Sequence, residues 1–415
     1  MKSIIKQNCK IPWVCIIVFF ITAMSAITGK ASERIFLEPL IAVDSDTGMP
    51  EGRVKISPVL SAKARLDSNF YKDDKDERQV YTYVIQPGIK LDYETAKSSV
   101  KFGYTLDAHY YSDNDKVPEG SVDSNDKDFI GHSFDLSAKI TPVSKLTLDL
   151  KERFRKTRDQ SESDRFAVDE SKDKYSINTL TPGLFYRFNE RFAAGLKYQN
   201  TILSYNKGSS EDYRENKGVF DFLYYFSPTA SLDMEYQRWK RSYDIDMSDY
   251  MSDRISLFFR KQAKHLGFEI GAGYHKRDFD NDAYEDSDTF SYLAAISGRF
   301  SKTYAKLSFE EDFNSSGLAD SFYRARQIAL KTGRVFMNRL STDLNGYYQF
   351  SDYEYTSRED DTYGISAAIG YKFKNWLSAK LTGGYDKRDS NYDPEDYDNS
   401  YIMLGFDSAY DIGRP

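Results

Sequence analysis

The sequence is poor in the residues that build metal sites and disulfide frameworks. Its 415 residues include two cysteines, Cys9 and Cys15, and four histidines. The histidines show no metal-ligand spacing, and two cysteines near the N-terminus cannot staple so long a chain. The sequence therefore predicts no metal, no cofactor and no enzyme activity. The histidines are His109, His132, His265 and His275.

Long apolar runs are also missing after residue 31. A membrane-spanning helix needs about 20 nearly uninterrupted apolar residues, whereas the mean hydropathy of the chain is -0.64. A helical membrane protein is therefore excluded. Disorder is excluded as well, because disordered chains contain few aromatics and 15% of these residues are aromatic. The formal net charge of -7 argues against nucleic acid as a partner.

The first 31 residues have the pattern of a secretory signal peptide. Lysines dominate residues 1–10, residues 11–29 carry no charge, and small residues precede Ala31. This order predicts export and cleavage after Ala31; an uncleaved anchor helix is the alternative. Cleavage would remove four lysines and no acids, giving a net charge of -11. Residues 32–52 then form an irregular periplasmic lead.

From residue 53 onward, side chains alternate between apolar and polar. In 232–237, Leu232, Met234 and Tyr236 alternate with acidic and amide residues. Similar alternation occupies 100–110, 146–151 and 305–310. Period-two alternation is typical of strands with one apolar and one polar face.

The connections between these strands alternate in length. Eight short turns are expected at 94–98, 142–145, 189–191, 227–229, 263–265, 301–303, 332–337 and 374–375. Nine longer, acidic loops are expected at 72–79, 113–128, 158–173, 206–216, 244–250, 280–288, 314–321, 352–360 and 389–399. These connections join eighteen strands, with both chain ends on the short-turn side. Sixteen strands would also fit, because predicted boundaries slip by a few residues.

Strand length and aromatic placement favour a membrane barrel over a soluble β-protein. Strands of about ten residues match the height of a bilayer. Aromatics flank the short turns, as at Phe188, Phe192 and Trp376, which is typical of an interfacial girdle. We therefore predict an all-β, transmembrane, antiparallel up-and-down β-barrel over residues 53–415, with short periplasmic turns and long acidic extracellular loops.

The chain resembles a known family over most of its length after residue 31, on motifs that include several in its first strands. The residues concerned are Lys55-Ile56-Ser57-Pro58, Asp67-Ser68-Asn69-Phe70-Tyr71, Ile85-Gln86-Pro87-Gly88-Ile89 and Phe102-Gly103-Tyr104. They are similar to β-barrel porins of Gram-negative outer membranes that are associated with exopolysaccharide production. The resemblance implies an outer-membrane, porin-like barrel and, by association, a role in polysaccharide export. The C-terminus departs from outer-membrane barrels, which end on an aromatic, so the assembly machinery is expected to bind Phe406 to Tyr410 internally.

Four basic pairs end strands at the extracellular side. Each lysine lies an even number of residues from an apolar residue near the start of its strand, so the lysines face lipid and the arginines face the lumen. We predict contacts with lipopolysaccharide for Lys156, Lys240, Lys276 and Lys387. We predict an anion-attracting pore mouth for Arg155, Arg241, Arg277 and Arg388. The alternative is that each pair neutralises its own acidic loop.

Farther from the extracellular ends of the strands, charged residues of both signs occupy positions that alternation places on the inward face. A hydrated lumen accounts for them, because unpaired charges in a dry interior are costly. The predicted pore-lining set is Lys101, Asp107, Asp149, Lys151, Lys197, Asp233, Glu235, Lys306, Glu310 and Lys380, with Lys63, Arg65 and Asp67 in the same phase.

Two local motifs complete the prediction. Pro87 and Pro182 stand mid-strand, which predicts bulges or bends because proline lacks the ladder donor. Alternate carboxylates at 278–282 suggest calcium, but Ala283 stands where an EF-hand loop needs glycine. We interpret that segment as a solvated loop.

The sequence thus predicts a channel in a Gram-negative outer membrane. Its solute is a small hydrophilic molecule or an exported polysaccharide. Two alternatives stay open, a sleeve around a redox or secretion partner and a non-conducting adhesin.

Overall fold

The computed structural model describes residues 52–75, 77–114, 116–117, 121, 123–167, 170–206, 212–244, 249–314 and 322–412, without the side chains of 160 and 170–172. The predicted signal peptide and residues 32–51 of the predicted lead lie outside this part of the chain. None of the described segments forms a helix long and apolar enough to cross a membrane.

In the described part of the chain, eighteen antiparallel strands form one closed sheet, which confirms the predicted number and class. The first nine are β1 (Arg53–Asp67), β2 (Val80–Glu94), β3 (Ser98–Asp113), β4 (Phe129–Val143), β5 (Leu146–Asp159), β6 (Glu170–Arg187), β7 (Phe192–Tyr205), β8 (Tyr213–Ser227) and β9 (Ala230–Tyr243). The others are β10 (Tyr250–Gln262), β11 (Leu266–Phe279), β12 (Ser287–Phe300), β13 (Thr303–Phe313), β14 (Tyr323–Phe336), β15 (Leu340–Tyr353), β16 (Glu359–Lys374), β17 (Leu377–Ser390) and β18 (Tyr397–Ala409). Short 3-10 helices are η1 (Ser124–Lys127), η2 (Gln160–Glu162) and η5 (Asp393–Glu395).

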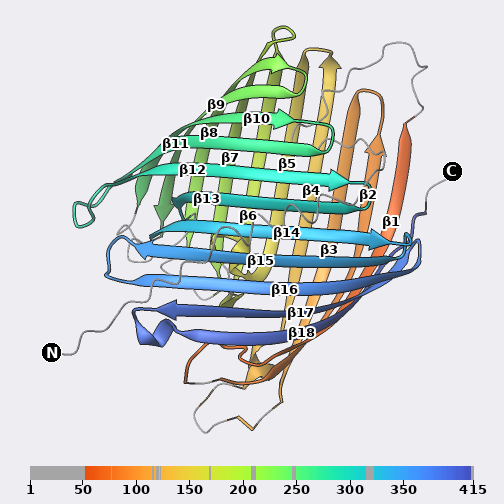
Figure 1. Ribbon diagram of the computed structural model, residues 1–415, viewed down its shortest axis with the longest axis vertical. Helices are drawn as coiled ribbons and strands as arrows, with labels where there is room; N and C mark the ends of the chain where they lie inside the picture. The colour runs from red at the N-terminus through yellow and green to blue at the C-terminus, as the bar shows by residue number, and fades with distance from the viewer. Residues whose placement is uncertain are drawn as a thin grey trace.

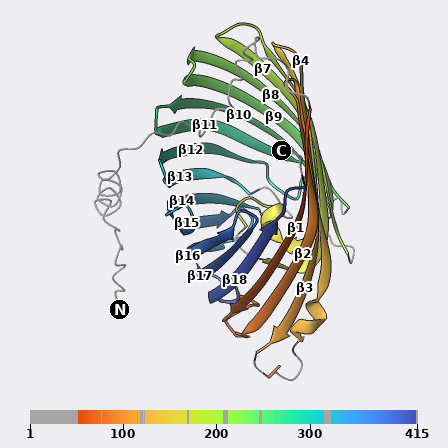
Figure 2. The ribbon, with the colours of Figure 1, turned by 90° about the vertical axis from the view of Figure 1, so that its right-hand side faces the viewer.

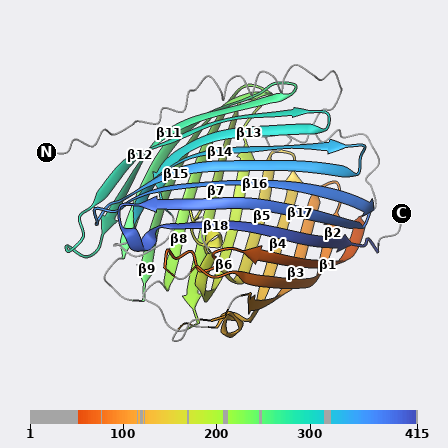
Figure 3. The same cartoon turned by 60° about the horizontal axis from the view of Figure 1, so that its bottom comes forward.

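Each strand pairs with its neighbours in sequence, and β1 pairs with β18 to close the ring. The front strands cross the direction of the rear strands because all are tilted to the barrel axis (Figure 1). The short turns after β14 and β16 lie at the same end as the C-terminus, and η5 lies at the other end (Figure 3). The turn after β14 is later than predicted, because that strand continues to Phe336.

Alternation divides the barrel wall into two faces. In β9, Met234 and Tyr236 are 40% and 39% exposed, whereas Asp233, next to Met234, is buried. Exposed aromatics gather at the short turns, including Phe188, Phe226 and Phe373. A barrel with an apolar outer band and an aromatic girdle is suited to a bilayer.

The two Pro-Gly motifs interrupt hydrogen bonding without producing bulges. Between β2 and β3, Ile85 pairs with Ala108 and Gly88 with Thr105, so the register is the same on both sides of Pro87. The register between β6 and β7 is likewise kept across Pro182. Bulges at these two prolines are therefore ruled out, and the bends that the sequence offered as the alternative stay a prediction. Each proline removes a ladder donor, but neighbouring pairs on both sides hold the strand in place.

The β1–β18 seam continues beyond the last strand. The backbone N–H groups of Tyr410 and Ile412 donate to the carbonyls of Pro58 and Ile56, at 3.1 and 2.7 Å. The Asp411 carboxylate accepts from Ser57 Oγ at 2.7 Å and pairs with a β1 lysine at 3.0 Å. The residues after β18 thus complete the barrel closure.

Acid is expected to weaken this seam. Hydrogen bonds from Ser57 and Lys55 lower the pKa of the Asp411 carboxyl below its ordinary value of 3.8. A lowered folded pKa means that the stabilisation is present above the ordinary pKa and is lost as the pH falls through the lowered value. Heat-induced unfolding followed by gel mobility should therefore show a larger loss of stability near pH 3 for the native protein than for Asp411→Asn. Equal acid sensitivity in both would contradict this role.

Candidate functional site

The lumen is partly filled by the segment between β5 and β6, residues 160–167, which we call the inward loop. Figure 2 shows this segment in yellow inside the ring of strands. At its base, Glu162 pairs with Arg153 and Arg155 of β5, at 2.5 and 3.7 Å. These two ion pairs hold the start of the inward loop against β5.

The far end of the inward loop is fixed to the opposite wall. Arg165 pairs with Glu310 and Asp312 of β13, at 2.7 and 2.8 Å. Tyr323 of β14 donates its hydroxyl to Asp164 at 3.0 Å. Phe166 is 2% exposed and packs with Tyr323, Ala325 and Tyr353. Since β13 is eight strands from β5 in the sheet, the loop spans the lumen.

Asp312 is the residue that organises this contact. Its carboxylate accepts from Arg165 at 2.8 Å, from Arg254 of β10 at 2.6 Å, and contacts His275 Nδ1 of β11 at 2.9 Å. The carboxylate is 4% exposed. One buried acid therefore connects the inward loop to three strands, and charge-assisted bonds of this kind are the strong ones.

A cavity of about 390 Å³ lies between the inward loop and the wall formed by β6 to β13. Five cationic and three carboxylate side chains line it, so cations are in excess among the lining residues, while Glu235 and Glu310, which pair with Arg254 and Arg165, lie outside the lining. The cations are Arg165, Lys217, Arg241, Arg254 and Arg277, and the acids are Glu162, Glu215 and Asp312. An anion in this cavity would meet favourable potential, focused by the surrounding protein.

Arg277 contributes a buried charge to the cavity wall. It is 1% exposed, lies over the rings of Tyr250 and Phe322 at 4.7 and 4.2 Å, and donates to the Asn314 carbonyl at 3.3 Å. Its Nε and Nη1 have no hydrogen-bond partner in the described part of the chain. The Arg277 charge also acts on Glu354, which directly follows β15. Burial raises the pKa of the Glu354 carboxyl, and a hydrogen bond from Ser287 and the Arg277 charge act against that rise.

Aromatic side chains pack around these arginines and narrow the extracellular half of the lumen. Arg241 lies 4.0 Å from the Tyr213 ring and pairs with Glu215 at 2.6 Å. The cluster comprises Tyr175, Ile177, Leu203, Tyr213, Trp239, Tyr243, Tyr250 and Phe322. A packed aromatic wall thus borders this part of the lumen.

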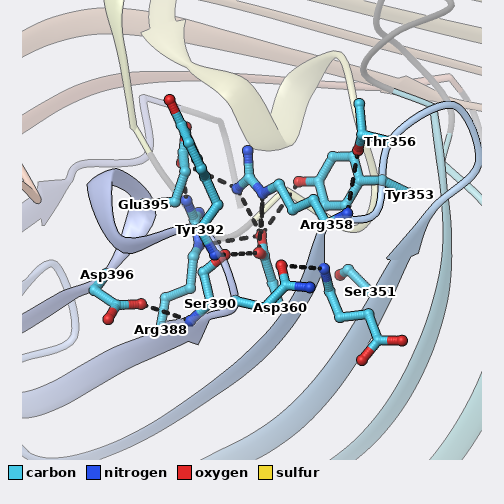
Figure 4. A network of polar contacts seen from close by, with 12 residues as sticks. Ser351, Tyr353, Thr356, Arg358, Asp360, Arg388, Ser390, Tyr392, Glu395 and Asp396 are labelled. Carbon is cyan, nitrogen blue, oxygen red and sulfur yellow. Dashed lines mark hydrogen bonds and ion pairs between the residues drawn. The ribbon is translucent and has the colours of Figure 1, made fainter.

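A second polar network fixes the loops before β16 and β18 (Figure 4). Asp360, which is 2% exposed, accepts from Arg358 at 2.6 Å and from Ser390 at 2.7 Å. Glu395 of η5 pairs with Arg358 at 3.0 Å and with Arg388 at 2.9 Å. Arg358 also lies over the Tyr353 ring, which packs against Phe166 and its neighbours. The network therefore supports the wall on which the inward loop rests.

The four predicted rim arginines occupy two different environments. Arg155 and Arg388 have side chains 14% exposed, and they pair with Asp135 and Glu395. Arg241 and Arg277 are buried in the aromatic wall instead of forming an open mouth. The difference arises because aromatics share their inward phase on β8 to β11 and enclose them.

The other predicted inward residues lie on the polar face, many of them paired. Lys197 pairs with Asp221 at 3.1 Å, and Lys380 with Asp343 at 3.2 Å. Asp233, Glu235 and Glu310 pair with Arg260, Arg254 and Arg165, Asp107 accepts from Gln86 and Ser133, and Arg65 pairs with Asp67. The strand register also places three predicted residues on this face, each opposite a small neighbour: Lys101 opposite Ser137, Asp149 opposite Gly183 and Lys306 opposite Ser297. Alternation along the strand adds Lys63, two residues from Arg65, and Lys151, two residues from Asp149.

Three of the four predicted lipid-facing lysines have acidic partners. Lys240 pairs with Asp280 at 2.8 Å, Lys387 with Asp389 at 2.6 Å, and Lys276 with Asp278. This arrangement fits local neutralisation of the acidic loops. Lys156 has no such partner among the described residues, and it is considered below.

Sequence reasoning missed Asp312, Arg254, Arg165 and Phe166. The first two follow the same alternation as the predicted set and could have been found from it. The inward position of Arg165 and Phe166 has no local signal, because loop residues have no fixed phase. In the described part of the chain, no three His, Cys, Asp or Glu residues are placed to hold a metal ion.

These features define a class: a closed eighteen-stranded barrel with an apolar belt, an aromatic girdle and a charged lumen constricted by an inward loop is an outer-membrane channel. The family model "Putative beta-barrel porin 2" matches residues 45–410. The chain belongs to this family of porins, and it forms an outer-membrane channel for solute passage. No curated protein sequence matches the chain.

Solved porins share the fold at low sequence identity. OccAB4 of Acinetobacter baumannii is 9% identical, with 87% of this chain and 98% of that chain covered and a TM-score of 0.50. OccK2 (OpdF) of Pseudomonas aeruginosa is 14% identical, with 86% and 98% covered and a TM-score of 0.50. OccK7 (OpdD) of the same organism is 12% identical, with 88% and 100% covered and a TM-score of 0.50.

Proposed function

We propose that this porin is a non-catalytic channel for small hydrophilic solutes and that its constriction favours anions. The observation that carries the proposal is the pairing of Arg165 in the inward loop with Asp312 on the far wall, at 2.8 Å. A loop fixed at both ends divides the lumen and limits the cross-section of any solute. A folded polymer or a partner protein would need the space that this loop occupies.

The preference for anions rests on the charges around the cavity. Its cationic side chains outnumber its carboxylates, and Arg277 forms no contact ion pair among the described residues, although its charge acts on the Glu354 carboxyl. A buried, unpaired guanidinium is costly, so an anion that enters the cavity is stabilised there. The excess positive charge also raises the local concentration of anions.

Planar-bilayer recordings test the proposal. The purified barrel is expected to conduct, and the reversal potential in a KCl gradient should show that chloride permeates faster than potassium. Absence of conductance would contradict channel activity of the isolated protein. A cation-selective current would overturn the proposed preference for anions.

Proteoliposome swelling separates a small-solute pore from a polysaccharide conduit. OccK2 (OpdF) has been solved in complex with glucuronate, so glucuronate is a suitable anionic probe with neutral glucose as its matched control. We expect faster uptake of glucuronate than of glucose and exclusion of a long dextran. Passage of the dextran would instead favour polysaccharide export, the alternative implied by the family resemblance.

The proposal includes export and assembly steps carried by the chain ends. We infer that residues 1–31 direct secretion and are removed, and that the assembly machinery binds Phe406 to Tyr410, where Phe406 and Tyr410 are 45% and 57% exposed. Intact-mass measurement of protein isolated from outer membranes should give a chain beginning at Ser32. A mass that includes the first 31 residues would contradict cleavage.

A further inference from the structure

Lys156 differs from the other outward lysines in its surroundings. The other three have carboxylate partners on their own strand or in an adjoining loop. Lys156 instead lies beside His132 of β4 and Ser176 of β6 in the sheet register. Its strand continues to Arg158, so the nearest charges along the strand are also positive.

A second lysine joins this site from β6. Lys174 lies two residues before Ser176 and therefore on the same face. Besides burial, the charges of Arg158, Lys156 and Lys127 disfavour its ammonium, and the Asp128 carboxylate favours it. The Asp128 side chain accepts the Tyr111 N–H at 2.7 Å, while Lys174 Nζ donates to the Asp128 carbonyl at 3.1 Å.

The patch lies on the outer surface at the extracellular end of β4 to β6. Ile130, two residues from His132, is 52% exposed, and Tyr110 of β3 is 50% exposed. His132 contacts the Tyr104 hydroxyl at 2.8 Å, which is a polar contact at the edge of an apolar belt. Cations at this height face the headgroup layer of the outer leaflet.

We propose that Lys156 and Lys174, with Lys127 above them, bind a phosphate group of lipopolysaccharide in the outer leaflet. Repulsion among neighbouring ammonium groups is relieved when a phosphate lies between them. The adjoining apolar surface provides contact for acyl chains, which selects an anchored lipid over free phosphate. This proposal is independent of the solute that the channel passes.

Lipid binding by the detergent-purified full chain tests the site. Bisphosphorylated lipid A should raise the temperature of heat-induced unfolding of the native barrel, whereas its dephosphorylated form and inorganic phosphate should not. The double variant Lys156→Gln/Lys174→Gln should bind lipid A about 30-fold more weakly, because each lysine near an anionic lipid contributes about fivefold in affinity.

Two matched variants make the result decisive. Lys240→Gln/Lys276→Gln removes two outward lysines that have acidic partners, so it should bind lipid A as the native barrel does. Lys156→Arg/Lys174→Arg keeps the charge and should retain binding. Equal weakening in both Gln variants, unchanged binding in Lys156→Gln/Lys174→Gln, or equal stabilisation by inorganic phosphate would overturn the proposal.

Discussion

Asp312→Asn is expected to release the inward loop and raise the single-channel conductance. The substitution removes the negative charge that holds Arg165, Arg254 and His275 together. Loss of one partner from a buried ion pair costs about 3–5 kcal/mol, because the remaining charges stay buried without compensation. The loop should detach from β13 and widen the passage. Planar-bilayer recordings would show larger and more variable current steps than in the native channel.

The neighbouring acid provides the control for this prediction. Glu310 also pairs with Arg165, but its side chain is 34% exposed, and solvent-exposed pairs contribute about 0–1 kcal/mol. Glu310→Gln should therefore leave the conductance close to the native value. If Asp312→Asn folds, shown by its heat-modifiable gel mobility, and conducts as the native channel does, the loop is not held by this carboxylate.

Arg254→Gln is expected to reverse or strongly reduce the preference for chloride. Arg254 faces the cavity and pairs with Asp312 at 2.6 Å and with Glu235 at 3.3 Å. Removal of its charge leaves both carboxylates with fewer cations, so the potential in the constriction becomes more negative. The reversal potential in a KCl gradient should move toward that of a cation-selective pore.

A charge-conserving variant distinguishes electrostatics from loss of structure. Arg254→Lys keeps the positive charge but cannot make the same forked hydrogen bonds. It should retain most of the chloride preference even if the conductance changes. A shift in selectivity of the same size in Arg254→Lys and Arg254→Gln would show that geometry, not charge, sets the preference.

The sequence predicts the face of the sheet on which a residue lies, but it does not predict how exposed that residue is. Alternation places both Lys197 and Arg241 on the inward face. Lys197 is 46% exposed in its side chain, whereas Arg241 is 5% exposed. The difference depends on Tyr213, Tyr243 and Tyr250, which come from three strands and pack around Arg241. Alternation assigns a face, and packing between strands decides whether that face is open.

The four basic pairs make the same point for the outer surface. Alternation predicts four equivalent outward-facing lysines. In the structure, Lys156 and Lys240 differ in the charged residues that surround them. Lys240 pairs with Asp280 in the connection between β11 and β12, whereas Lys156 lies near Lys174. Which charges meet depends on strand register and on loop paths, neither of which a single strand specifies.

The sequence by itself determined the up-and-down barrel class, the two faces of each strand and the ends at which long and short connections lie, whereas the structure decided between sixteen and eighteen strands. These properties are local, because side chains alternate with period two and turns occupy a few residues. Only the tertiary structure decided that the segment after β5 enters the lumen. Its contact, Arg165 with Asp312, joins residues 147 positions apart. Such a pair forms because closure of the barrel brings opposite walls within reach of one loop.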